Sequence, residues 1–138
     1  MREIYSLLML LLQPLLRAKL RKRGQQEPGY LERMEERWGD YKQLDGAGQP
    51  HSHVWNESSL AYRPTLWIHA VSLGETRAAA VLLRELRQGL PGMRLLLTHG
   101  TATGRAEGKA LLQDGDRQVW LPWDPPQAVD RFLRRFMP

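Results

Sequence analysis

The chain is short and has an ordinary globular composition: 138 residues, of which 42% are hydrophobic, give room for one domain with a modest core. The absence of cysteine excludes a disulfide framework and excludes thiolates as zinc ligands or nucleophiles, which suits the cytoplasm. The formal net charge of +5 lies entirely in residues 1–23, because residues 24–138 carry fourteen basic and fourteen acidic groups. A neutral body argues against a nucleic-acid partner, and we expect none.

The amino-terminal arm joins an apolar run to a basic cluster. The run covers residues 4–16, is interrupted by Gln13 and Pro14, and is shorter than the roughly 20 residues that cross a bilayer comfortably. A cleaved signal peptide would carry its charges before the run, whereas here they follow it. We therefore predict a retained helix over residues 1–23 that docks on a membrane surface; the alternative is a core helix with a solvated basic end. The expected membrane contacts are Leu7, Leu8, Leu11, Leu12, Arg17, Lys19, Arg21, Lys22 and Arg23.

Residues 24–64 are expected to form a short helix and a loop. The segment PGYLERMEERWG, residues 28–39, predicts an amphipathic helix with a solvated charged face. Its expected apolar face consists of Tyr30, Leu31, Met34 and Trp38. Residues 40–63 lose this periodicity and are expected to be a loop. His51 and His53 lie there, but no cysteine or carboxylate nearby completes a ligand set, so we predict no metal site.

Residues 65–138 alternate between strand and helix patterns. The expected strands are 66–71, 93–98 and 118–121, and the expected helices are 75–88, 102–112 and 126–136. The first of these helices is expected to turn Ala79, Leu82, Leu83 and Leu86 inward. Short connections between alternating elements predict parallel strands joined by right-handed crossovers. The sequence therefore predicts an α/β fold with a partial Rossmann-like sheet.

A carboxylate stands where the first strand passes into its helix. The stretch LWIHAVSLGET, residues 66–76, places Glu75 in the first helical turn, and ligands of open parallel sheets bind beyond the carboxyl ends of the strands. Glu75 is thus a candidate for substrate chemistry. Ser72 and Glu75 also have the spacing of a capping box, which spacing alone favours. Both interpretations stay open at this point.

The second strand ends in a comparable motif, THGTATG, residues 98–104. Its hydroxyls and free amides at a helix start can hold a phosphate or sugar hydroxyls. Neither the P-loop spacing nor G-x-G-x-x-G is present. The alternative is that Thr101 or Thr103 simply caps the helix.

The third strand runs into Trp123, Asp124 and two prolines. Asp124 is expected to start the last helix, since proline is favoured in a first turn. Trp123 can stack on a sugar or merely pack.

The ordered series IHAVSLGE, THGTATG and VWLPWDPPQAVDRFLRRFMP follows the apolar-basic arm and PGYLERMEERWG. Together these segments resemble the amino-terminal half of bacterial 3-deoxy-D-manno-octulosonic acid (Kdo) transferases. The likeness covers essentially the whole chain and is weakest over residues 40–63. It implies a glycosyltransferase of the GT-B type at the cytoplasmic face of the inner membrane. Such an enzyme would move Kdo from CMP-Kdo to a lipid A precursor, lipid IVA, and release CMP without a cofactor.

The resemblance also implies roles for individual residues. Glu75 matches the glutamate that acts as general base in the family's H-A-V-S-x-G-E motif. The expected substrate-binding residues around it are Ser72, Gly74, Thr98, Thr101, Thr103 and Gly104. The family's acidic motif after the next strand and its CMP-sugar-binding domain have no counterpart in residues 65–138. We therefore expect a truncated acceptor-side domain that is inactive by itself; the alternative is a non-catalytic remnant or membrane-docked interaction module.

Overall fold

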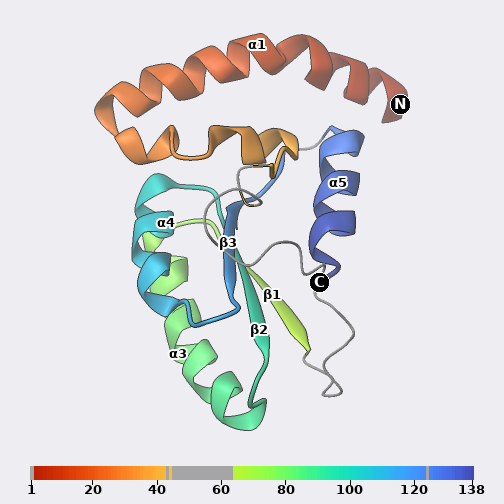
Figure 1. Cartoon of the computed structure of the whole chain (residues 1–138). Helices are drawn as coiled ribbons and strands as arrows, with labels where there is room; N and C mark the ends of the chain where they lie inside the picture. Colours follow the sequence, from red (N-terminus) through yellow and green to blue (C-terminus); the bar gives the residue numbers. More distant parts are fainter. Residues whose placement is uncertain (1, 43, 45–63, 124) are drawn as a thin grey trace.

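The computed structural model describes residues 2–42, 44, 64–123 and 125–138, and it arranges them as helices around a small parallel sheet (Figure 1). The strands are β1 (Thr65–Ala70), β2 (Arg94–His99) and β3 (Arg117–Trp120). The α-helices are α1 (Arg2–Gln26), α3 (Leu73–Gly89), α4 (Ala102–Gly108) and α5 (Pro126–Phe136). Three short 3-10 helices complete the described part: η1 (Pro28–Tyr30), η2 (Met34–Trp38) and η3 (Lys109–Leu111).

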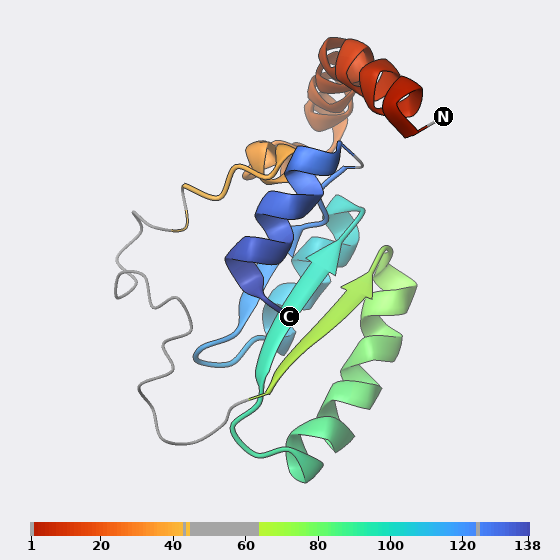
Figure 2. The same cartoon turned by 90° about the vertical axis from the view of Figure 1, so that its right-hand side faces the viewer.

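The sheet confirms the predicted α/β fold. Its strand order is β1-β2-β3, and both neighbouring pairs are parallel. Helices α3 and α4 cover one face, while α5 covers the other (Figure 1). Each strand begins within one residue of its expected position. All three carboxyl ends point towards the side where α1, η1 and η2 lie (Figure 2), so the loops that carry the sequence motifs meet at one edge.

The central strand is buried on both faces, which explains its uninterrupted apolar run. Leu95 and Leu97 pack under α3, and Leu96 packs under α5, because side chains alternate along a strand. On the α5 side the aromatic ring of Phe132 lies 5.0 Å from that of Trp67. The prediction that Leu82 turns inward was wrong, since 53% of its surface is exposed. Its neighbour Leu83 takes the buried position.

The segment after α1 departs most from the expectation. In place of one amphipathic α-helix it forms η1 and η2, because Arg33 between them adopts the left-handed conformation with φ of 50°. Leu31 is exposed rather than part of the apolar face. The prediction of a solvated charged face was also wrong. Glu36 and Arg37 are only 2% and 4% exposed.

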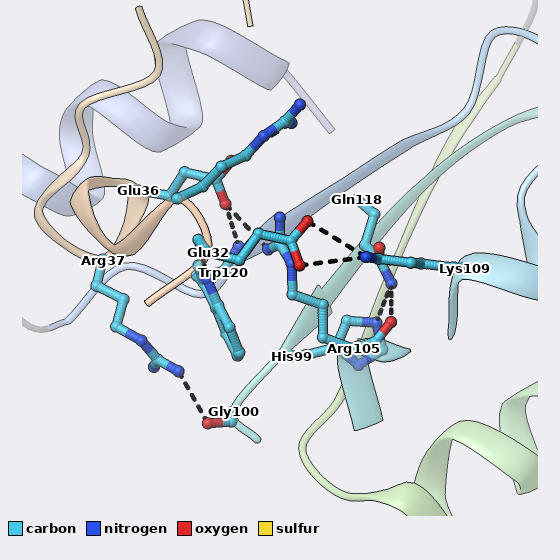
Figure 3. Close-up of polar contacts among 10 residues, drawn as sticks. Glu32, Glu36, Arg37, His99, Gly100, Arg105, Lys109, Gln118 and Trp120 are labelled. Atoms are coloured by element: carbon cyan, nitrogen blue, oxygen red, sulfur yellow. Dashed lines mark hydrogen bonds and ion pairs between the residues drawn. The ribbon is translucent and has the colours of Figure 1, made fainter. Parts of the chain in front are cut away.

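Glu36 is buried because it covers the free edge of the sheet (Figure 3). Its Oε2 accepts hydrogen bonds from the Trp120 backbone N at 2.8 Å and from Arg105 Nη1 at 3.1 Å. Burial raises the pKa of the Glu36 carboxyl, and the guanidinium of Arg105 opposes that shift. A side chain from the amino-terminal segment thus occupies a position that a further strand would fill.

His99 forms a second buried polar network at the end of β2 (Figure 3). Its Nδ1 donates to the Ala70 carbonyl at 2.9 Å, since a carbonyl oxygen can only accept. Its Nε2 accepts from Gln118 Nε2 at 3.0 Å, and that amide also donates to the Arg105 carbonyl at 2.8 Å. These partners fix a neutral imidazole. A Cβ at Gly108 would lie 2.6 Å from His99 Nε2, so glycine is required for this approach.

The buried imidazole makes the stability of the fold sensitive to mild acid. Burial lowers the pKa of His99 from 6.5 to about 4. Between about pH 6.5 and pH 4 the unfolded chain therefore binds a proton at His99 that the folded chain does not bind. The free energy of unfolding falls as the pH drops through this range. The total loss from this group is roughly 3 kcal/mol. Urea denaturation at pH 7, 5.5 and 4.5 should show His99→Gln losing less stability on acidification than the wild type, and parallel pH profiles would contradict the assignment.

Candidate functional site

Glu75 folds back over the start of α3. Ser72 is the N-cap residue of that helix, and its Oγ accepts from the Glu75 backbone N at 3.4 Å. The Ser72 hydroxyl donates to Glu75 Oε1 at 3.2 Å, and the Val71 backbone N donates to Glu75 Oε2 at 2.9 Å. The predicted capping interaction is confirmed. Each carboxylate oxygen thus has one protein donor, and Glu75 is nevertheless an exposed residue.

The second motif is joined directly to this turn. Thr101 is the N-cap residue of α4, and its Oγ1 accepts from the Gly104 backbone N at 3.2 Å. The same hydroxyl donates to the Val71 carbonyl at 2.8 Å, and the Thr101 backbone N donates to that carbonyl at 3.0 Å. A Cβ at Gly104 would lie 3.1 Å from the Ser72 carbonyl carbon. The structure therefore brings the two motifs into contact, with Val71 between them.

The predicted substrate-binding residues differ in accessibility. Gly74 and Thr103 are exposed, Ser72 and Thr101 are partly buried, and Thr98 and Gly104 are buried. The hydroxyl of Thr98 is engaged within the protein, since it accepts from Trp67 Nε1 at 3.0 Å and lies 3.0 Å from His69 Nδ1. Four of these residues thus present atoms at or near the surface around Glu75. Thr98 instead holds the side chains of β1.

Trp123 packs against the protein rather than standing free. Its ring lies 5.1 Å from that of Trp38, and its backbone N donates to the Arg37 carbonyl at 2.8 Å. Asp124, the expected start of the last helix, lies outside the described residues, as do His51 and His53. In the described part of the chain, no group of three or more histidine, aspartate or glutamate side chains is placed to hold a metal ion.

Arg37 also contacts this edge of the sheet, and the sequence did not predict it there. Its Nη2 donates to the Gly100 carbonyl at 3.0 Å, and its guanidinium carbon lies 4.0 Å from the centre of the Trp120 ring (Figure 3). Burial lowers the pKa of Arg37 to about 10, so the side chain remains charged at neutral pH. An arginine within a charged helical pattern normally indicates a solvated face, which is why periodicity missed it.

A cavity of about 250 Å³ lies elsewhere, beside the start of β3. Arg33, Lys109 and Arg117 are among the residues that line it, and none of the predicted site residues does. Lys109 is already paired with Glu32 at 3.2 Å. This cavity is separate from the edge of the sheet that carries Glu75.

Helix α1 packs on the body through its second half. Leu20 is buried there, Arg17 lies 4.2 Å over the Trp38 ring, and Arg23 lies 4.4 Å over the Tyr30 ring. The exposed large apolar residues of its first half are Ile4, Tyr5, Leu8, Leu10, Leu11 and Leu15. The helix continues through Pro14, and the side chain of Leu7 is outside the described part. No helix among the described residues is long and apolar enough to span a membrane.

The amino-acid sequence of this chain is similar to those of known proteins. A family model described as 3-Deoxy-D-manno-octulosonic-acid transferase (kdotransferase) matches residues 32–138. The chain is 53% identical over 79 residues to 3-deoxy-D-manno-octulosonic acid transferase of Bordetella pertussis, which covers 53% of this chain and 18% of that protein. It is 31% identical over 137 residues to the enzyme of the same name from Haemophilus influenzae, covering 99% of this chain and 29% of that protein.

A third relative is the probable mitochondrial 3-deoxy-D-manno-octulosonic acid transferase of Arabidopsis thaliana, 34% identical over 97 residues, covering 66% of this chain and 22% of that protein. No solved structure matches the chain. The chain spans less than a third of the length of these relatives. The family model nevertheless covers most of its residues, and the chain belongs to the 3-deoxy-D-manno-octulosonic-acid transferase family.

Proposed function

We propose that this chain forms the acceptor side of a Kdo transferase that moves Kdo from CMP-Kdo to a lipid A precursor. The observation that carries the proposal is the exposed carboxylate of Glu75 at the carboxyl edge of a parallel sheet, held in place by Ser72 and Val71. Ligands of open α/β sheets bind at this edge. The identity of the transferred sugar is inferred from the names of the relatives.

In this proposal Glu75 acts as the general base. An acceptor hydroxyl attacks the anomeric carbon of Kdo, and the bond from that carbon to the phosphate oxygen of CMP breaks. Glu75 takes the proton that the hydroxyl loses, and CMP leaves with the bonding electrons. Because CMP is a good leaving group, one carboxylate beside the attacking hydroxyl suffices, and the step needs no cofactor.

The residues around Glu75 are suited to binding oxygen-rich groups. The hydroxyl of Thr103 and the backbone at Gly74 lie at the starts of two helices, where hydroxyls and amides bind sugars or phosphates. The hydroxyls of Ser72 and Thr101 lie beside them but already donate to Glu75 and to the Val71 carbonyl, so they can only accept a further hydrogen bond. In the proposal these groups orient the acceptor. Gly104 contributes by allowing α4 to approach Ser72 closely.

A membrane surface is the proposed location, at the cytoplasmic face of the bacterial inner membrane. The first half of α1 exposes several leucines, and 68% of the surface of Leu11 is accessible. Lys19, Arg21 and Lys22 follow on the same helix and are exposed. Apolar side chains next to basic ones favour docking on anionic headgroups.

A membrane-docked module without turnover is the second candidate function. The observation in its favour is that the Glu75 carboxylate already has a structural role in capping α3. In that case the same arm would dock, but Glu75 would contribute only to stability. Measurement of transfer separates the two candidates.

We expect Glu75→Gln to abolish most of the transfer while leaving the fold intact. The assay uses a chimera in which this chain replaces the matching part of the Haemophilus influenzae relative, which aligns with 99% of it, with CMP-Kdo and a lipid A precursor as substrates. Glutamine keeps the size of the side chain but cannot accept the proton, so the rate should fall on the order of 100-fold or more. The 138-residue chain alone is expected to give no transfer, because it spans less than a third of its relatives.

Ser72→Ala is the matched control, since it removes the cap but leaves the carboxylate. It should cost about 1 kcal/mol of stability, measured by urea denaturation, and lower the rate per folded molecule far less than Glu75→Gln does, because the carboxylate remains. A near-normal rate in Glu75→Gln would leave capping as the whole role of this residue, whereas no transfer by the unsubstituted chimera would favour the second candidate.

Docking should depend on the exposed leucines of α1. Replacing Leu8, Leu11 and Leu15 by serine removes apolar surface that has no partner in the described protein, so binding to vesicles containing anionic lipid should weaken by more than about tenfold in sedimentation. Val81→Ser with Leu82→Ser is the control, because both side chains are equally exposed on α3. Added salt should weaken binding only in part. If the α1 variant sediments like the wild type, the arm does not carry the membrane affinity.

A further inference from the structure

Arg37 connects three segments at the carboxyl edge of the sheet. Its guanidinium lies over the Trp120 ring at the end of β3, and its backbone carbonyl accepts from Trp123 N in the loop after that strand. Its Nη2 donates to the Gly100 carbonyl in the loop after β2. A residue 4% exposed and held by three segments has one conformation available to it.

The hydrogen bond from Arg37 to the Gly100 carbonyl fixes a peptide group that is hydrogen-bonded on both sides. The carbonyl oxygen of Gly100 and the backbone N of Thr101 belong to the same planar unit. Arg37 holds the oxygen at 3.0 Å, and the N–H on the other side donates to the Val71 carbonyl at 3.0 Å. Rotation of this unit would break both bonds together. A charged donor makes the bond to Gly100 stronger than one between neutral groups.

Val71 connects this peptide group to Glu75 through hydrogen bonds. Its carbonyl is held by Gly100 N at 3.3 Å and by Thr101, and its own N–H donates to Glu75 Oε2 at 2.9 Å. The loops also touch closely, because a Cβ at Gly100 would lie 2.8 Å from Val71 Cγ1. A displaced Gly100 peptide therefore moves the backbone that aims the carboxylate.

We propose that Arg37 is a positioning residue for Glu75, acting through the Gly100–Thr101 peptide and Val71. The inference rests on the proposed function, in which Glu75 is the base. Arg37 touches neither substrate in this arrangement. It sets the direction of the carboxylate, and a small misplacement of a reacting group costs a large factor in rate.

Arg105 is buried beside the same Trp120 ring but makes a different contact. Its guanidinium carbon lies 4.8 Å from the same ring, but its donor reaches Glu36 rather than the loop after β2. Arg105 holds the edge of the sheet. Of the two arginines, Arg37 has the contact that leads towards Glu75 (Figure 3).

The test compares Arg37→Met, Arg37→Lys and a destabilised control, Phe132→Leu, which alters the core on the opposite side of the sheet. In the chimera described above, Arg37→Met should lower kcat per folded molecule by about tenfold or more with KM within about twofold, because the interaction matters in the transition state. Arg37→Lys keeps a charged donor and should recover most of kcat. Phe132→Leu should lower stability with kcat unchanged.

Two further measurements make the proposal falsifiable. In the 138-residue chain, amide hydrogen exchange at Thr101 and Val71 should accelerate in Arg37→Met more than in Phe132→Leu of matched stability; equal acceleration overturns the proposal. In the chimera, Arg37→Met should have no further effect on kcat when Glu75 is already Gln, since it acts through that residue. If Arg37→Met lowers kcat as much in the Glu75→Gln background as in the unsubstituted chimera, the positioning role is overturned. A normal rate in Glu75→Gln alone would instead refute the role of Glu75 as the base, without refuting the connection between Arg37 and Glu75. If Arg37→Met fails to fold, the same two comparisons with Arg37→Lys decide.

Discussion

The buried ion pair between Glu36 and Arg105 is the constraint on which the rest of the arrangement depends. Taking either charge out of water costs several kcal/mol, and removing one partner of such a pair typically costs about 3–5 kcal/mol. Here the carboxylate also holds the backbone N of Trp120, so the pair fixes η2 against the edge of β3. Arg37 follows Glu36 directly in the chain. By fixing η2, the ion pair therefore also fixes the backbone from which the Arg37 guanidinium reaches Trp120 and Gly100.

Trp120 allows two arginines to be buried close together. Its indole lies near the guanidinium groups of Arg37 and Arg105 and stacks on Tyr30 with an interplanar angle of 8°. The electron-rich face of the ring attracts cations, and its Nε1 donates to the Glu32 carbonyl at 2.7 Å. The aromatic cluster therefore joins the amino-terminal segment to the sheet through both apolar and electrostatic contacts.

The sequence predicted the elements whose partners are close in the chain. Each strand of residues 65–138 neighbours the next one, and the pattern of Leu95–Leu97 reports burial on both faces, so order and direction followed from periodicity. The cap formed by Ser72 and Glu75 followed from a spacing of three residues. The burial of Glu36 and Arg37 did not, because their partners are 63 to 84 residues away and a charged helical pattern contains no information about them.

The distance along the chain between Glu36 and Trp120 also has a consequence for the order of assembly. During synthesis the segment that carries Glu36 leaves the ribosome before β3, because the backbone N that Glu36 holds is made 84 residues later. Contacts of such long sequence separation form late in folding. The η2 segment is thus joined to the edge of the sheet only when β3 has been added.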